Sequence, residues 1–215
     1  MTAKSIIELK GHHINHDLYV VATGPSGHFI DQSFFNNKIS IGVNEAWIYF
    51  SNLDYLVRKE SARGLAALKS GIPLITSKYN AGSYRAGLNA YDGQFDYYVF
   101  DHQDNLLKDI NFREIKTDQI VVSYSTITSA MHVAAYMGAA NIILVGHDCG
   151  LVDGMQRLPG LPGALGGDQF HRKFLQQIEP QTLAVRAWLK DRYGCNIYSL
   201  NPWINFGLEG HIYER

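Results

Sequence analysis

Short runs of β-branched, aromatic and other apolar residues recur along the chain. In several of them, such as ISIGV and NIILV, the apolar positions are consecutive rather than alternating. That pattern is typical of strands that helices cover on both faces. The predicted strands are 17–22, 38–43, 54–58, 73–76, 97–100, 141–145 and 196–200.

Helical stretches fall between these runs, and helices are predicted over 61–70, 125–137 and 170–193. A glycine follows each one, where a left-handed residue commonly ends a helix; these are Gly71, Gly138 and Gly194. The alternation predicts an α/β fold of the doubly wound, Rossmann-like kind, with a mostly parallel sheet and helices on both faces. No internal repeat or linker divides residues 1–215, so one domain is expected.

The segment 150–167, GLVDGMQRLPGLPGALGG, is rich in glycine and proline and shows no periodicity. Loops of this length are usually lids or disordered segments, so a flexible lid is predicted. Ordering it would cost about 1–2 kcal/mol per residue, which a bound ligand or a second subunit of a homo-oligomer could offset. The alternative is a mobile surface insertion.

Charge and composition argue against some classes of binding partner. A formal charge of -1 gives the whole molecule no electrostatic hold on nucleic acid or an anionic membrane. Cys149 and Cys195 show no metal-binding spacing and are expected to be free thiols. The sequence contains no apolar run of about 20 residues and no signal-peptide core near its start, so a cytoplasmic protein without a membrane span is expected.

Candidate chemistry gathers where strands end, because doubly wound sheets bind ligands beyond the carboxyl ends of their strands. The first strand leads into Thr23, Gly24, Pro25 and Ser26. Backbone N–H groups of such a turn can hold a phosphate, although a tight strand-to-helix turn is the alternative. Asn44 follows the second strand and could bind a ribose hydroxyl or a phosphate oxygen, or simply cap the next helix.

The segment 123–148 is the most patterned part of the chain. Hydroxyl side chains crowd the start of its helix, at Ser123, Ser125, Thr126, Thr128 and Ser129. Hydroxyls and free N–H groups at a helix N-terminus favour an anion. The following strand ends at Gly146 and Asp148, and this carboxylate could bind a ribose, a divalent ion or an acceptor hydroxyl, or only form a turn.

Histidine offers a further candidate. His171 opens the last helix directly after the glycine-rich segment, which suits a general base brought in by lid closure, or an exposed histidine at a helix start. The cluster of His12, His13 and His16 is interpreted as a solvated polar segment, and no metal site is predicted.

Five motifs in order carry a resemblance: ATGPSG, IGVNEAW, DYLVRKE, TITSAMHVAAYMGAANIILVGHD and WLKDRYGCNIYSLNPW. Together they resemble the bacterial sialyltransferases that use CMP-sialic acid. They also resemble the domain family similar to 6-hydroxymethylpterin pyrophosphokinase, which includes motility accessory factor-like proteins. The resemblance spans about 17–205 and implies a single Rossmann-like nucleotide-binding domain over 1–215.

The resemblance also implies site residues. Those expected to face the nucleotide are Thr23, Gly24, Pro25, Ser26, Asn44, Thr128, Ser129 and Gly146, with Asp148 beside the base and sugar. The family usually has Asn at the position of Thr23. The sialyltransferases place tyrosines in the following loop, and 150–167 contains none. Their catalytic histidine matches Gln177 here, with His171 about two turns upstream as the candidate base.

These features favour transfer of a sugar from a CMP- or UDP-type donor to a glycan or small-molecule acceptor, with His171 or Asp148 as base. Such a protein would serve polysaccharide biosynthesis and needs no cofactor besides its donor. One alternative is a pyrophosphokinase, which would require Mg²⁺ held by Asp148 with Asp153 or Asp101. Another is a relative that binds a nucleotide or sugar without catalysis.

Overall fold

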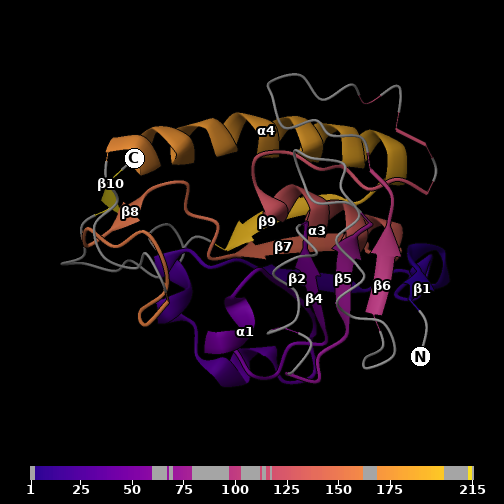
Figure 1. The fold of residues 1–215 in the computed structure, drawn as a ribbon, viewed down its shortest axis with the longest axis horizontal. Coiled ribbons are helices and arrows are strands. Elements are labelled where there is room, and N and C mark those ends of the chain that lie inside the picture. Colours follow the sequence, from indigo (N-terminus) through magenta and orange to yellow (C-terminus); the bar gives the residue numbers. More distant parts are fainter. Residues whose placement is uncertain are drawn as a thin grey trace.

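The structure is a computed structural model that describes residues 3–59, 67, 70–78, 97–102, 112, 115–116, 118–161, 169–200 and 213–214, with side chains for all of these except 169–176 and 213–214. Its centre is an eight-stranded sheet in the order β1-β6-β5-β4-β3-β2-β7-β9, and every pairing in it is parallel (Figure 1). The strands are β1 (Lys4–Ser5), β2 (Asp17–Val21), β3 (Ile39–Val43), β4 (Tyr55–Arg58), β5 (Leu74–Ser77), β6 (Tyr97–Phe100), β7 (Asn141–Val145) and β9 (Asn196–Leu200).

All seven predicted strands are confirmed, and their ends differ from the prediction by no more than one residue. Three short strands were not predicted. One is β1, and the others are β8 (Leu151–Val152) and β10 (Tyr213–Glu214), which form a separate antiparallel pair. Each of these has only two residues, too few for a periodic pattern to be visible in the sequence.

The chain reverses its direction of travel across the sheet beside β2. From β2 it proceeds outward through β3, β4, β5 and β6, and it then returns to place β7 on the opposite side of β2. In the register of the sheet, Val21 pairs with Gly42 on one side and with Val145 on the other. The carboxyl ends of β2, β3 and β7 therefore meet at a topological switch point, where ligands bind in open α/β sheets.

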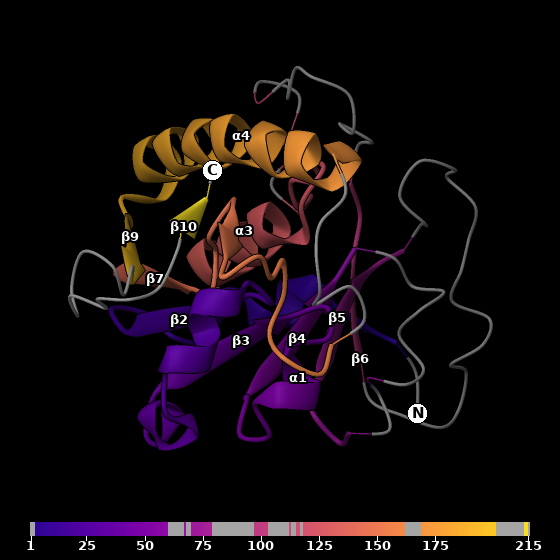
Figure 2. The same ribbon diagram turned by 90° about the vertical axis from the view of Figure 1, so that its left-hand side faces the viewer.

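Helices cover both faces of the sheet, as predicted (Figure 2). On one face α3 (Thr126–Tyr136) packs on β2, β3 and β4, and α4 (Gln169–Tyr193) crosses over α3 and β9. The other face is covered by α1 (Ala46–Tyr49) and by the 3₁₀ helices η2 (Pro25–Phe29) and η3 (Gln32–Phe35).

The two layers explain the consecutive apolar residues of the strands. Val20 belongs to the core beneath α3, whereas its neighbour Val21 belongs to the core beneath α1, η2 and η3. Leu56 and Val57 in β4 divide between the two layers in the same way. Since side chains of a strand point alternately to opposite faces, only a strand buried on both sides needs apolar residues at every position.

Two of the predicted helix ends are confirmed, because Gly138 and Gly194 follow α3 and α4 with φ angles of 95° and 72° in the left-handed region. Gly71 also has a left-handed φ angle, of 79°. Two predicted helices are present as α3 and α4. The third, over 61–70, lies outside the described residues apart from Ala67 and Ser70.

The glycine-rich segment differs from the prediction in its first part. Leu151, Val152, Leu158 and Leu161 are buried, and the Leu158 N–H donates a hydrogen bond of 2.8 Å to the Thr23 carbonyl. Residues 150–161 therefore pack against the body of the protein, because four apolar side chains enter its core. The prediction of a flexible lid is revised for this part, and residues 162–167 lie outside the described chain.

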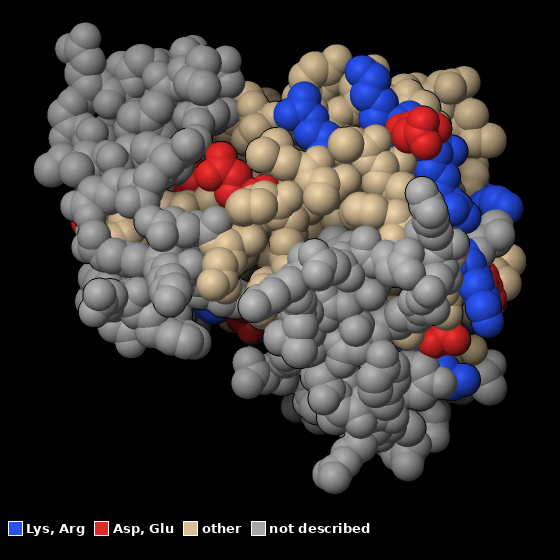
Figure 3. All heavy atoms as spheres, turned by 90° about the horizontal axis from the view of Figure 1, so that it is seen from above, with Lys and Arg blue, Asp and Glu red and all other residues tan. Residues whose placement is uncertain are grey.

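The surface over α4 carries side chains of both signs, and the basic ones gather along one rim (Figure 3). Among the helices that the structure describes, none is long and apolar enough to cross a bilayer. Cys149 and Cys195 are free thiols, as predicted.

Candidate functional site

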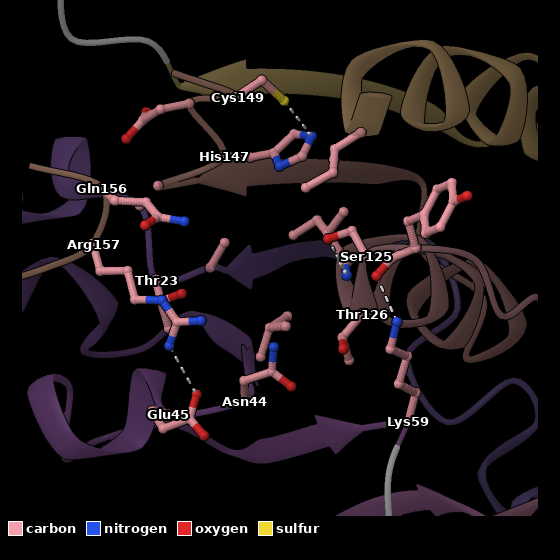
Figure 4. Close-up of a pocket in the computed structure, with 18 of the residues that line it drawn as sticks. Thr23, Asn44, Glu45, Lys59, Ser125, Thr126, His147, Cys149, Gln156 and Arg157 are labelled. Carbon is pink, nitrogen blue, oxygen red and sulfur yellow. Dashed lines mark hydrogen bonds and ion pairs between the residues drawn. The ribbon is translucent and has the colours of Figure 1, made fainter. Parts of the chain in front are cut away.

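A cavity of about 430 Å³ opens at the topological switch point. Its floor is formed by the residues that follow β2, β3, β4 and β7, and the start of α3 forms one wall (Figure 4). Gln156 and Arg157, from the segment after β8, form the opposite wall, and Ile178 of α4 also lines the cavity. Its position is the one that the doubly wound topology predicts for a ligand.

Thr23 and Asn44 line this cavity, as the sequence predicted. Asn44 has a φ angle of +55°, a left-handed conformation that asparagine tolerates better than most residues. The alternative role of Asn44 as a helix cap is not observed, because the cap of α1 is Glu45 and makes no side-chain capping bond. The Asn44 amide faces the cavity (Figure 4) and hydrogen-bonds to no other residue in the described part of the chain. It is therefore available to a ligand.

The N-terminus of α3 points its first residues at the same space. Ser125 is the N-cap, and its Oγ accepts a hydrogen bond of 3.4 Å from the Ile127 N–H. Thr126 follows as the first helical residue and also lines the cavity. The first N–H groups of a helix lack intrahelical acceptors and carry a partial positive charge, so an anion is stabilised there.

Three basic side chains surround the cavity, and two of them share one acidic partner. Arg58 forms an ion pair of 2.9 Å with Glu45, and Arg157 approaches the other Glu45 oxygen at 3.7 Å. Lys59 donates hydrogen bonds to the carbonyls of Ser123 and Tyr124, beside the start of α3. Glu45 therefore offsets part of this charge and leaves the cavity suited to a negatively charged ligand.

Arg58 has an unused donor inside this site. Its side chain is only 6% exposed, and its Nε is buried without a hydrogen-bond partner. A buried donor left without an acceptor costs about 1–3 kcal/mol. Because this Nε is closed off from the cavity, Arg58 contributes positive charge to the lining rather than a free Nε donor.

Asp148 lies at the edge of the cavity and connects two loops. Its Oδ2 accepts a hydrogen bond of 2.8 Å from the Ser26 N–H, across 122 positions of sequence. Burial raises the pKa of Asp148, and the hydrogen bonds from Ser26 lower it in part. The carboxyl group thus holds the turn after β2 against the loop after β7.

The turn after β2 does not offer its backbone to a ligand in the way that the sequence suggested. The Gly24 N–H donates to the Gly146 carbonyl at 2.9 Å, and the Gly27 N–H donates to the Gly24 carbonyl at 3.1 Å. The Ser26 N–H is bound to Asp148, and Pro25 has no N–H. Every N–H group between 24 and 27 is therefore satisfied within the protein, which corrects the expectation that a phosphate docks on them.

The bare turn has a different cause. A Cβ atom on Gly24 would lie 2.3 Å from the Gly146 carbonyl oxygen and 2.6 Å from Asp148 Oδ2. Gly24 is glycine because the ends of β2 and β7 approach too closely for a side chain. Gly24 and Gly146 still line the cavity, whereas Pro25 and Ser26 are buried and do not.

Thr128 and Ser129 are also placed differently from the prediction. Both are fully buried and outside the cavity wall. The Ser129 hydroxyl donates to the Val121 carbonyl at 2.7 Å, and the Thr128 hydroxyl donates to the Ser125 carbonyl at 2.8 Å. The hydroxyl residues at the cavity are Ser125 and Thr126, because the N-cap and the first helical residue lie at the end of α3 that borders the cavity.

The remaining predicted groups are dispersed. His171 belongs to the first turn of α4, and its side chain lies outside what the structure describes. Asp101 and Asp153, the proposed partners of Asp148 for Mg²⁺, do not line the cavity. Within the described ranges, no three His, Cys, Asp or Glu side chains come together to hold a metal ion.

His147 is a cavity residue that the sequence did not single out as a catalytic group. Its Nε2 lies 2.9 Å from Thr182 Oγ1 of α4 and 3.5 Å from Cys149 Sγ. Burial lowers its pKa to about 4. Its place directly after β7, beside Asp148, was the signal that could have identified it.

Comparison with solved structures finds two similar folds. The sialyltransferase CST-II, whose crystal structure contains CMP and a trisaccharide acceptor, has a TM-score of 0.50 and 17% identity over 86% of this chain and 81% of that chain. The MAf glycosyltransferase from Magnetospirillum magneticum AMB-1 has a TM-score of 0.45 and 13% identity over 93% of this chain and 38% of that chain. No protein-family model and no curated protein matches the sequence. The likeness to CST-II shows that the two chains share the Rossmann-like fold.

Proposed function

We propose that this protein is a glycosyltransferase that binds a CMP- or UDP-type nucleotide sugar in the cavity at the switch point. The nucleotide phosphate would lie between the N-terminus of α3 and the guanidinium groups of Arg58 and Arg157. The sugar would be transferred to a hydroxyl group of a glycan or small-molecule acceptor.

The observation that carries this proposal is the positively charged lining of the cavity. Arg58, Lys59 and Arg157 line it, and the N-terminus of α3 borders the same space. Three basic side chains face two acidic ones, and burial disfavours ionisation of one of these, Asp148. A phosphate group supplies the negative charge and the acceptor oxygens that this lining lacks.

The same groups suit the chemistry of transfer. As the bond between the anomeric carbon and the phosphate oxygen breaks, negative charge develops on the leaving phosphate. Donors that already point at that position, from Arg58, Arg157 and α3, would stabilise the charge without reorganisation. Asn44 and Thr23, on the floor of the cavity, would contact the ribose or the phosphate.

The likeness to CST-II supports a ligand of this class. That sialyltransferase was crystallised with CMP and a trisaccharide acceptor and shares the fold over 86% of this chain. The predicted base residues His171 and Asp148 remain candidates. Asp148 borders the cavity with its Oδ2 already bound to the Ser26 N–H.

The test is a thermal-shift measurement with CMP, UDP, GDP, ADP, ATP and their sugar conjugates, each with and without Mg²⁺. A ligand at 100 times its Kd adds about 2.7 kcal/mol of stability, which corresponds to a rise in Tm of about 5–10 °C for a chain of this size. We expect CMP or UDP to give such a rise without added metal. Binding of ATP that strictly requires Mg²⁺ would instead favour the pyrophosphokinase alternative.

Two variants connect that response to the cavity. Asn44→Ala and Arg157→Met should each weaken nucleotide binding about five- to twentyfold, since each removes a hydrogen bond to a polar or charged group. Arg186→Met on the exposed side of α4 is the matched control and should bind as the wild type does. A nucleotide response that survives both cavity variants unchanged would place the site elsewhere and overturn the proposal.

A further inference from the structure

The imidazole of His147 projects from the loop after β7 into the cavity, with its Nε2 edge toward Cys149 (Figure 4). Its other nitrogen, Nδ1, lies on the side that faces away from Cys149 and toward the space proposed for the donor (Figure 4). The ring is therefore oriented by contacts at its Nε2 edge, with Thr182 and Cys149.

Those contacts also decide which ring nitrogen carries the proton. The hydroxyl of Thr182 has a single hydrogen, which it donates to the Ile178 carbonyl at 3.1 Å within α4. Thr182 Oγ1 can then only accept from His147, whose Nε2 lies 2.9 Å away. Nε2 must be protonated, and a neutral imidazole protonated there has its lone pair on Nδ1.

We propose that His147 is the catalytic base of this protein and that Thr182 is the positioning residue that holds it in the tautomer protonated at Nε2. This inference rests on the proposed function, since it requires an acceptor hydroxyl to be activated in the cavity. The assignment of His147 does not come from the resemblance that suggested Asp148 and His171. It depends only on the hydrogen bonds between the loop after β7 and α4.

The step balances as follows. The acceptor hydroxyl transfers its proton to His147 Nδ1, and the acceptor oxygen forms a bond to the anomeric carbon. The bond from that carbon to the phosphate oxygen breaks, and its electron pair leaves with the nucleotide. The imidazolium, now protonated on both nitrogens, returns the extra proton to solvent after the products depart.

Burial keeps the ring in its basic form at neutral pH. Burial lowers the pKa of His147 to about 4, so the imidazole is neutral above that pH. The titratable groups that share the cavity are Cys149 and Asp148 on the same loop and, on other elements, Glu45, Arg58, Lys59, Tyr124 and Arg157. A proton received by Nδ1 is therefore held weakly and is released readily in each cycle.

Two pairs of variants test the proposal, with release of nucleotide from CMP-sialic acid and UDP-sugars as the assay. A positioned general base contributes about 10²–10⁴-fold, so His147→Gln should reduce kcat by at least 100-fold. Its affinity for free CMP or UDP should stay within about twofold, because the nucleotide is held by other residues. His12→Gln is the matched control, because His12 is exposed and lies near the N-terminus, and this variant should retain wild-type activity.

The positioning role of Thr182 has its own readouts. Thr182→Val removes the acceptor for Nε2–H and should lower kcat about tenfold or more, whereas Thr182→Ser keeps the hydroxyl and should restore it. Long-range ¹H–¹⁵N correlation spectra of the ligand-free protein should show His147 protonated at Nε2 in the wild type and a mixture of tautomers in Thr182→Val. For kcat/KM, an acid limb with an apparent pKa near 4 is expected in the wild type and should be lost in His147→Gln.

The outcomes separate this inference from the proposed function. Turnover by the wild type that persists in His147→Gln overturns the role of His147 and leaves the transferase intact. A spectrum with the proton on Nδ1 overturns both the role of Thr182 and that of His147 Nδ1 as the base, and it also leaves the transferase intact. If the wild type turns over none of the donors, the proposed function fails, and the inference fails with it.

Discussion

The Ser26 N–H donates a hydrogen bond of 2.8 Å to Oδ2 of Asp148, and this bond joins two loops through residues that lie 122 positions apart in sequence. It holds the turn after β2 against the loop after β7 at the edge of the cavity. Since the same loops carry Thr23, Gly146 and His147, the position of the ligand-facing groups depends on a bond that faces the protein interior.

Removal of this bond should destabilise the protein. Asp148→Ala leaves the Ser26 N–H without its acceptor, at a cost of about 1–3 kcal/mol. Urea unfolding followed by circular dichroism measures the change in the free energy of unfolding. Asp191→Ala, on the exposed side of α4, is the control and should stay within about 0.5 kcal/mol of the wild type. Equal stability of the two variants would mean that Asp148 does not hold the loops together.

Asp148→Asn should change how stability depends on pH. Burial raises the pKa of Asp148 in the folded protein above its ordinary value of 3.8, so between these two pKa values the folded chain binds a proton that the unfolded chain has lost. Stability contributed by this group therefore falls as pH rises through that window. Asparagine stays neutral and still has an acceptor oxygen, so Tm of the variant relative to the wild type should rise from pH 4 to pH 7. A constant difference would contradict the raised pKa.

Substitution of Gly24 should be far more damaging than that of its neighbour Gly27. An alanine Cβ at 24 meets the backbone oxygen of Gly146 at 2.3 Å. At 27 the nearest atoms belong to side chains, a Leu158 methyl at 3.1 Å and the Phe50 ring at 3.7 Å. Gly24→Ala should cost about 3 kcal/mol through overpacking, and Gly27→Ala less than about 1 kcal/mol. Thermal unfolding of both variants measures this difference, and similar melting temperatures would refute the close approach of β2 and β7.

Substitutions of two hydroxyl residues of α3 should have different effects, one on stability and the other on nucleotide binding. Ser129→Ala removes the buried bond to the Val121 carbonyl and should lower the free energy of unfolding by about 1–3 kcal/mol without changing affinity for CMP or UDP. Thr126→Val, at the cavity, should weaken nucleotide binding about fivefold and change stability little. Calorimetric titration and urea unfolding of both variants give the comparison. The reverse pattern would restore the nucleotide role predicted for Ser129 from the sequence.

Two buried histidines should make the protein sensitive to acid. Burial lowers the pKa of His132 to about 3, and that of His147 to about 4, from an ordinary value of 6.5. The unfolded chain then binds more protons than the folded one below pH 6.5, so stability is fully present above that pH and is lost as pH falls.

Between its pKa in the folded protein and 6.5, each histidine should make the free energy of unfolding fall by about 1.4 kcal/mol per pH unit as the pH is lowered. His132→Gln and His147→Gln should each remove one such contribution from the unfolding free energy measured between pH 6 and pH 4. The exposed His12→Gln should leave the slope unchanged. If neither variant changes the slope, these side chains are not held neutral by the fold.

Much of the fold follows from local pattern. The strands were found because Val20 and Val21, or Leu56 and Val57, are apolar on consecutive residues, and two-sided burial has no other simple sequence signature. The glycines that end helices were found because a left-handed residue there strongly favours glycine. Both signals belong to neighbouring residues, so no knowledge of the tertiary structure was needed.

The sequence predicted which strand ends lie near one another better than it predicted the role of each residue there. The topology places ligands at the carboxyl ends of the strands, so Thr23, Asn44, Gly146 and Asp148 were correctly expected near one another. Ser129 was misplaced because the sequence cannot show which residues of a helix start face the core. Arg157 and His147 were not selected as primary candidates because their role depends on contacts with Glu45 and Thr182, which are remote in sequence.

The sequence by itself determined the order of the strands along the chain, their burial on both sides and the edge of the sheet where the cavity opens. It could do so because hydrophobic period and helix-ending glycines are properties of a few adjacent residues. Only the tertiary structure showed that a side chain at position 24 would collide with Gly146, and that Arg58 has a buried donor without an acceptor. It also placed Thr182 where it can accept a hydrogen bond from His147. These features arise where segments far apart in sequence come within hydrogen-bonding distance, and that proximity exists only after the chain has folded.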